Sequence, residues 1–134
     1  MAGLQNVQEI HMPVAAAIAQ YKFVEMGNAG IVAAANAAGD DVVGVAQETR
    51  SAAQVTAGDV FIPVALPGCK CKVLAGAAID ISAAVVPVTS DASGRAVAVA
   101  AATDRVLGYA LQSATAADQV IEILFLKAAS HRDA

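Results

Sequence analysis

The chain has 134 residues and a formal charge of −4, and its 8 Lys and Arg residues are dispersed. This argues against a nucleic-acid-binding surface and against a polybasic membrane patch, and the length suits one domain. Hydrophobic residues make up 57% of the chain and include 34 Ala and 18 Val but no Trp, so the core must use small side chains. Burial contributes roughly 25 cal/mol per Å² of apolar surface, and a small side chain buries little of it. We therefore expect the protein to associate with copies of itself or with a larger surface.

Residues 1–19 lack the alternation and turn spacing of the rest of the chain, and we predict that they form an N-terminal arm. They include Glu9 and lack the basic residues that begin a signal peptide. The apolar run 12–19 is too short and too rich in alanine for a signal peptide or a membrane-spanning helix. We therefore expect a protein made in the cytoplasm and released only by lysis. Residues 128–134 are predicted to form a short polar C-terminal tail.

Residues 20–127 read as short apolar segments separated by turn residues, which is typical of one all-β domain, a compact sandwich or barrel-like body of short antiparallel strands. Residues 59–66 predict a strand with Pro63 at its middle, so that strand is expected at a sheet edge or with a bulge. Residues 68–74 alternate: Cys69, Cys71 and Val73 are expected to face inward, with Lys70 and Lys72 facing solvent or a partner.

Four further strands are predicted at residues 85–89, 95–99, 105–112 and 119–127. The last is apolar on both faces except at Glu122, which favours a central position or a subunit interface. The alanine runs 33–38 and 98–102 favour helix by propensity, but they are short and end in turn residues, so helix is the minor alternative.

Two stretches of the chain resemble each other. Residues 41–46 and 57–62, with a polar loop between them, match residues 104–110 and 116–121 around a second loop. Each copy is predicted to be one β-hairpin, unless alanine-rich β sequences match here by chance. Gly44 and Gly108 fall in mid-strand, where a bulge or a close backbone approach is expected.

No residue is predicted to be catalytic, to bind a cofactor or to bind a metal. His11 and His131 lie far from any nucleophile or carboxylate in a catalytic spacing. Cys69 and Cys71 lack the second ligand pair that a zinc site needs, and a disulfide across one residue would be strained, so two free buried thiols are expected. The aspartates mostly flank turns, where their side chains cap backbone amides.

The order of strand, Gly44-Val45-Ala46, loop, Gly58-Asp59 and strand resembles the capsid cement or head-decoration proteins of tailed bacteriophages. The later stretch is similar to them too, with Lys72-Val73, Ser93-Gly94, residues 105–110 and a closing Val120-Ile121-Glu122-Ile123. The likeness covers about residues 20–127. Ala117 departs from the pattern, because the second copy would want glycine there, and so does the pair Cys69 and Cys71.

The resemblance implies a structural virion protein without enzymatic activity. It would bind the outer capsid surface, bridge major capsid protein subunits and stabilise the shell after being made in the host bacterial cytoplasm. It implies a homo-oligomer, a trimer or a dimer with the trimer favoured, with no nucleic-acid or membrane partner and no cofactor. Residues 2–18 are then expected to contact the capsid, and residues 120–126 to form core or self-association surface.

Three other functions stay open. A carbohydrate-binding or fibre-type module would normally show exposed aromatic residues, and Tyr21 and Tyr109 are the only tyrosines. An enzyme subunit could complete an active site with a partner chain through the cysteines or a histidine. A phage tail-tube or connector protein is also small and rich in β structure.

Overall fold

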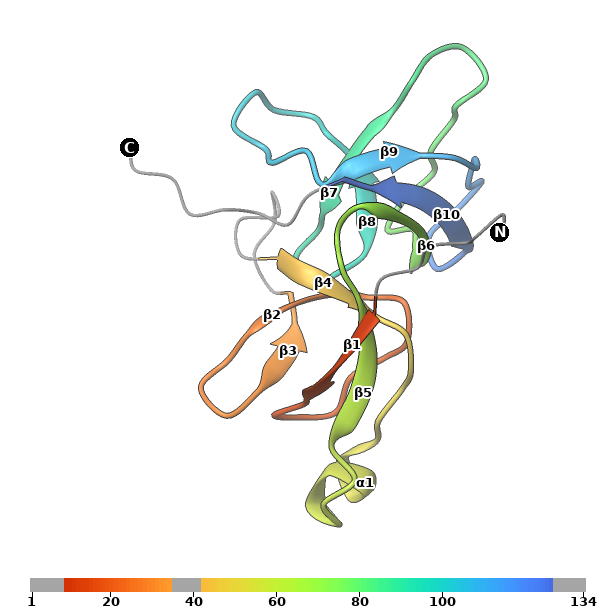
Figure 1. Cartoon of the computed structure of the whole chain (residues 1–134). Coiled ribbons are helices and arrows are strands. Elements are labelled where there is room, and N and C mark those ends of the chain that lie inside the picture. Colours follow the sequence, from red (N-terminus) through yellow and green to blue (C-terminus); the bar gives the residue numbers. More distant parts are fainter. Residues whose placement is uncertain (1–8, 35–41, 127–134) are drawn as a thin grey trace, which may run out of the picture.

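The computed structural model describes residues 9–34 and 42–126, and Figure 1 shows them as two groups of strands, one above the other. Within these residues ten strands form two five-stranded antiparallel sheets, and the one helix has five residues, so the predicted all-β class is confirmed. The predicted C-terminal tail at 128–134 lies outside the described residues.

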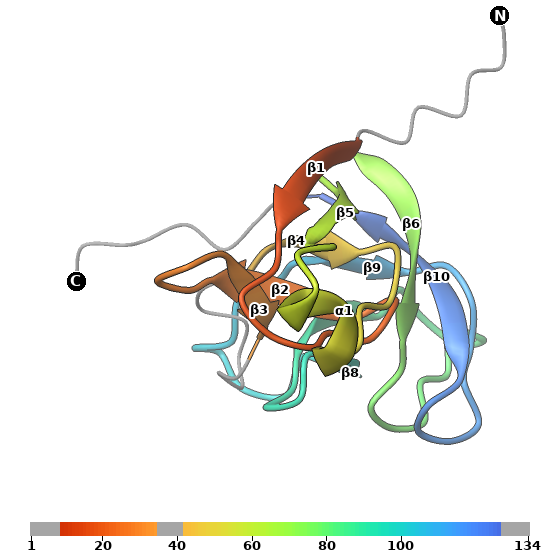
Figure 2. The same cartoon turned by 90° about the horizontal axis from the view of Figure 1, so that it is seen from below.

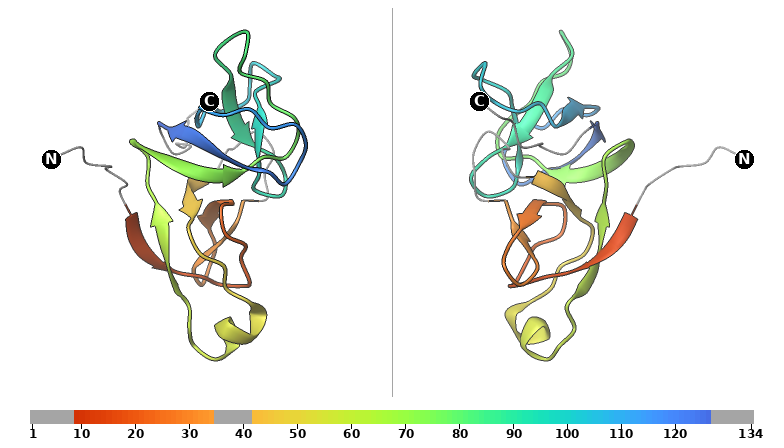
Figure 3. Two further views of the ribbon diagram at one scale, coloured as in Figure 1. Left: turned by 90° about the vertical axis from the view of Figure 1, so that its right-hand side faces the viewer. Right: turned by 60° about the vertical axis from the view of Figure 1, so that its left-hand side comes forward.

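The first sheet contains β1 (Glu9–Pro13), β2 (Phe23–Met26), β3 (Ile31–Ala33), β4 (Val42–Ala46) and β5 (Phe61–Ala65). The second contains β6 (Cys69–Leu74), β7 (Pro87–Ser90), β8 (Ala96–Ala98), β9 (Gly108–Ala110) and β10 (Val120–Phe125). The helix α1 (Ala52–Thr56) lies between β4 and β5. It lies at the opposite end of the molecule from the loop between β6 and β7 (Figure 3).

The two sheets share one topology. Their strand orders are β1-β5-β4-β2-β3 and β6-β10-β9-β7-β8, so each strand of the first sheet corresponds to the strand five places later. Isolated bridges repeat as well, with Ile18 to Arg50 in the first half and Ile79 to Ala114 in the second. The matched stretches are the antiparallel hairpins β4–β5 and β9–β10, which confirms the predicted hairpin in each copy.

A shared core joins the sheets. The larger cluster of buried side chains draws on both, and the rings of Phe23 and Phe125, both fully buried, meet with centroids 6.1 Å apart. A smaller cluster that includes Ile62 and Val64 fills the first half. Most of the remaining core is Val, Ile and Ala, as the composition predicts. In Figure 2, β6 starts beside the end of β5 and continues into the second group of strands.

Both glycines allow close backbone approach, although only Gly44 lies in mid-strand as expected, because Gly108 is the first residue of β9. A Cβ on Gly44 would lie 2.8 Å from the carbonyl oxygen of Ala65, and a Cβ on Gly108 would overlap the carbonyl oxygen of Leu124. The pairing of β2 with β4 also shifts register beside Gly44. The expected close approach is therefore found at both glycines, and the register shift leaves Val43, next to Gly44, without a partner in β2.

The expected edge position of the Pro63 strand is wrong. β5 lies between β1 and β4, and its pairings with them run without a register shift. The Pro63 carbonyl accepts from the backbone N–H of Gln47 (3.0 Å), just beyond the last paired residue of β4. Because the N–H and C=O of a strand residue point to the same side, the missing donor of Pro63 faces the point where the β4 ladder has ended.

The described part of the expected N-terminal arm belongs to the domain. β1 pairs with β5 along its length, and Val14 and Ile18 are buried. This differs from the arm expected at 1–19. Val14 and Ile18, which are separated by three alanines and not by alternating polar residues, anchor the segment in the core of the first half. Residues 1–8 lie outside the described residues.

The helix α1 was not expected, since its segment was interpreted as a polar loop. Ser51 caps it, with its hydroxyl accepting from the N–H of Gln54 (3.2 Å) while the Gln54 side chain accepts from the N–H of Ser51 (2.8 Å). The run 98–102 is not helical, and most of the run 33–38 lies outside the described residues.

A candidate site at the open edge of strand β6

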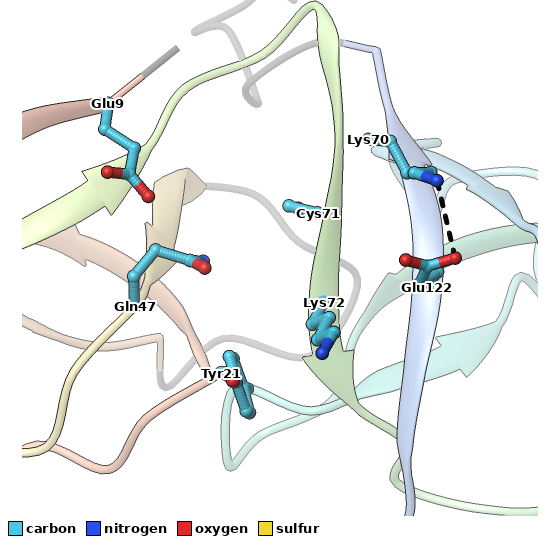
Figure 4. A pocket seen from close by; sticks show the side chains of 7 residues that line it. All are labelled: Glu9, Tyr21, Gln47, Lys70, Cys71, Lys72 and Glu122. Carbon is cyan, nitrogen blue, oxygen red and sulfur yellow. Dashed lines mark ion pairs between the residues drawn. The ribbon is translucent and has the colours of Figure 1, made fainter. Parts of the chain in front are cut away.

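The candidate site is an open cavity of about 480 Å³ beside β6. Figure 4 shows side chains from both halves of the molecule around it, with β6 between β10 on one side and the opening on the other. The lining residues are Glu9, Tyr21, Gln47, Lys70, Cys71, Lys72 and Glu122.

The edge of β6 that borders this cavity has unused backbone groups. β6 is an edge strand of its sheet and pairs only with β10 among the described strands. The N–H of Ala75 bonds to Gln119, on the β10 side, and the N–H of Leu74 points the other way. By alternation along the strand, the N–H and C=O groups of Lys70 and Lys72 also point away from β10, and no other described strand pairs with them.

Tyr21 closes one end of this edge. Its carbonyl accepts from the N–H of Leu74 (2.8 Å), and its own N–H donates to the carbonyl of Ala46 (2.7 Å). Its φ is +68°, a left-handed conformation that costs a non-glycine residue on the order of 1 to 3 kcal/mol. The two hydrogen bonds hold Tyr21 in this conformation, so the open part of the edge stops before Leu74.

The other end closes at the start of β6. The N–H of Gly68 donates to the carbonyl of Phe125 (2.7 Å). Lys70 and Lys72 are therefore the two residues of β6 whose backbone groups stay available for an added strand.

Charges of both signs surround the cavity. Lys70 lies 3.7 Å from Glu122, and both side chains are partly exposed. Lys72 and Glu9 have no ion pair with any residue that the structure describes. The outer face of the strand therefore offers positive charge from Lys72, while the inner face offers the buried, apolar sides of Cys69, Cys71 and Val73.

The cysteines are not poised to react. Both are free and buried, as expected. Burial, together with a smaller effect of the neighbouring Cys69, raises the pKa of the Cys71 thiol to about 12. The Cys69 thiol donates to the carbonyl of Leu66 (3.3 Å). A thiol that holds its proton at neutral pH is a poor nucleophile and a poor metal ligand.

The histidines and the turn aspartates do not come together in one site among the described residues. His11 is exposed on β1, and His131 lies outside the described residues. The side chains of Asp80, Asp91 and Asp104 accept backbone N–H groups in their own turns, as predicted. The bonds from Ser82 hold the pKa of Asp80 below its usual value. Among the described residues no three His, Cys, Asp or Glu side chains cluster as a metal site would need.

Sequence reasoning missed this site, although one signal was present. The alternation of lysine and cysteine on residues 69–72 predicted a face directed to solvent or a partner, and both lysines are exposed. Nothing in the sequence indicated that Tyr21 and Glu9, far away along the chain, would line the same cavity.

Comparisons with known proteins add no relationship. No protein-family model matches the sequence, and no curated protein matches it. None of the helices in the described ranges is long and apolar enough to cross a membrane.

Proposed function

We propose that this protein is a structural virion protein that binds the outside of a tailed-phage capsid and bridges major capsid protein subunits. The observation that carries the proposal is the pair of hairpins β4–β5 and β9–β10 at equivalent places of two like sheets. These hairpins hold the glycine motifs on which the resemblance to decoration proteins rests.

The proposed capsid contact is narrower than residues 2–18. Val14 and Ile18 are buried in the protein's own core, whereas Glu9, Ile10 and His11 are exposed on β1. We therefore leave residues 14–18 out of the contact and propose residues 2–8 and the exposed Phe61 for it, because the open edge of β1 is assigned below to a contact between copies.

The proposal includes no enzymatic activity and no cofactor. Its mechanism is mass action: a protein that binds only the assembled lattice stabilises that lattice. At a free concentration of 100 times Kd each bound site contributes about 2.7 kcal/mol, and many sites on one shell add to this.

Co-sedimentation tests the proposal. Purified protein is added to expanded capsids that lack it, to unexpanded shells and to tail tubes. Saturable binding to expanded capsids alone is expected, and deletion of residues 2–8 is expected to weaken it while deletion of residues 128–134 leaves it unchanged. The absence of saturable binding to expanded capsids contradicts the proposal.

One observation favours a second candidate. β1 and β6 are both open sheet edges, which also suits a tail-tube or connector subunit, because such rings assemble through contacts between neighbouring subunits. Binding to tail tubes rather than to shells would favour that function.

A further inference from the structure

We propose that the open edge of β6 binds strand β1 of a second copy of this protein, as an antiparallel strand added to the sheet. This rests on the proposed function and deepens it: the resemblance behind that proposal implies a homo-oligomer, and the strand pairing is the contact that would hold its copies together. The cavity beside β6 provides the space for the added strand.

β1 has its own open edge, equivalent to that of β6. β1 is an edge strand of the first sheet, as β6 is of the second sheet. The N–H of Val14 bonds to Val60 on the β5 side, just as the N–H of Ala75 bonds to Gln119 on the β10 side. By alternation, the backbone groups of Glu9 and His11 point away from β5, and no other described strand pairs with them.

One register matches the two edges at both ends. Glu9 of the second copy lies opposite Lys72, and His11 of the second copy lies opposite Lys70, so each pair exchanges two backbone hydrogen bonds. The next pair would be Pro13 of the second copy and Gly68. Proline has no N–H to donate, and the N–H of Gly68 is already bonded to Phe125. The pairing therefore ends at this pair, because neither residue has a free backbone N–H to donate.

One of the two side-chain pairs on the outer face, Glu9 with Lys72, is oppositely charged in this register. Paired residues of an antiparallel ladder lie on the same face, so the carboxylate of Glu9 meets the ammonium of Lys72. Neither has an ion pair within the described part of the chain. Pairing β6 with a second β6 would instead bring lysines together.

The inner face is complementary as well. Ile10 of the second copy lies opposite Cys71, which lines the cavity. Ile10 is a large apolar side chain that is 45% exposed in the single chain. The contact therefore buries the exposed part of an apolar side chain, which adds to the burial that a core of small residues provides.

The contact is head-to-tail, because it joins two different edges. Each copy donates β1 to one neighbour and accepts β1 from another, so a rotation that closes gives a ring or a closed dimer. Closure pairs the open edges of β1 and β6 in every copy and leaves neither of these two exposed to nonspecific strand pairing.

Proline substitutions test the backbone contacts in solution without capsids. Lys72→Pro and His11→Pro each remove one N–H that the domain itself leaves unused, so the fold is retained, which circular dichroism and thermal melting check. The full-length protein is expected to be an oligomer by analytical ultracentrifugation, and each variant to raise its dissociation constant about tenfold or more. A monomeric wild-type protein, or an oligomer that both folded variants leave intact, overturns the proposal.

Charge exchange tests the register and does not depend on the proline variants folding. Glu9→Lys and Lys72→Glu are each expected to raise the dissociation constant about two- to fivefold, and the double variant to restore it. Lys72→Arg, which keeps the charge, is the matched control and is expected to leave assembly unchanged. Failure of the double variant to restore assembly overturns the register.

The outcomes separate this inference from the proposed function. A monomer that still saturates expanded capsids overturns the strand pairing alone. An oligomer with the expected response to the variants that binds no capsid overturns the proposed function alone.

Discussion

At the scale of single residues, glycine is kept where two strands come too close for a side chain. Gly108 faces the carbonyl oxygen of Leu124, and Gly44 faces Val64 and Ala65. Each glycine sits in the first strand of its hairpin, against the second strand. The motif Gly-x-Ala is thus a packing requirement that occurs twice in one fold.

Gly108→Ala is expected to destabilise the protein by about 1–3 kcal/mol or more, because the added methyl group must displace the backbone of β10. Urea denaturation followed by circular dichroism measures this. Ala98→Ser, at an exposed position of β8, is a control of similar size and is expected to change stability by less than about 0.5 kcal/mol. A Gly108→Ala protein as stable as wild type would contradict the close approach.

Cys71 makes stability depend on alkaline pH. Its thiol has a pKa of about 12 in the folded protein against 9.0 for an ordinary cysteine, so its contribution is constant below pH 9 and is lost as the pH rises toward 12. Between pH 8 and about pH 10.5 the wild-type protein is expected to lose about 2 kcal/mol more stability than Cys71→Ala. Equal pH profiles in urea denaturation would show that the thiol is not buried as described.

At the scale of elements, local patterns predicted the strands whose faces differ most. The lysine and cysteine alternation located β6 and its buried face, and the apolar segment 119–127 located the inner strand β10. Two predictions failed for physical reasons. Pro63 lies inside the sheet because the side of its backbone that lacks an N–H faces the end of β4. Residues 9–19 belong to the domain because Val14 and Ile18 are buried in its core.

The helix α1 depends on its cap, since none of its residues is buried. Ser51→Ala removes the acceptor for the N–H of Gln54 and is expected to cost about 1 kcal/mol locally. Hydrogen exchange should therefore accelerate at residues 54–58 and stay unchanged in β6 and β10. Unchanged exchange at 54–58, or faster exchange throughout the molecule, would contradict a local role for the cap.

At the scale of the whole molecule, the repeat was visible in two stretches, but its extent was not. The hairpins matched because their glycines and turns are fixed by close packing. β1 and β6 are also equivalent in the structure, yet their sequences Glu9–Pro13 and Cys69–Leu74 share no pattern, because their exposed faces are not restrained by the core. For the same reason the candidate site, which joins residues distant in sequence, could not be predicted.

The sheets are expected to unfold together, because one cluster of side chains belongs to both. Phe125→Ala removes the ring that packs against Phe23 across the sheets and is expected to cost about 3–5 kcal/mol. Urea unfolding should remain a single transition by both circular dichroism and tyrosine fluorescence, with its midpoint lowered. Two separate transitions would show that the halves are independent.

We expect the protein to stabilise a capsid by binding its assembled lattice, and the melting temperature of the shell measures this stabilisation. Expanded capsids lacking the protein are melted with increasing amounts of it, and bound protein is measured in the same samples. The melting temperature is expected to rise with occupancy and to level off when the sites are filled. Capsids that carry saturating protein yet melt at an unchanged temperature would contradict a stabilising role for the protein.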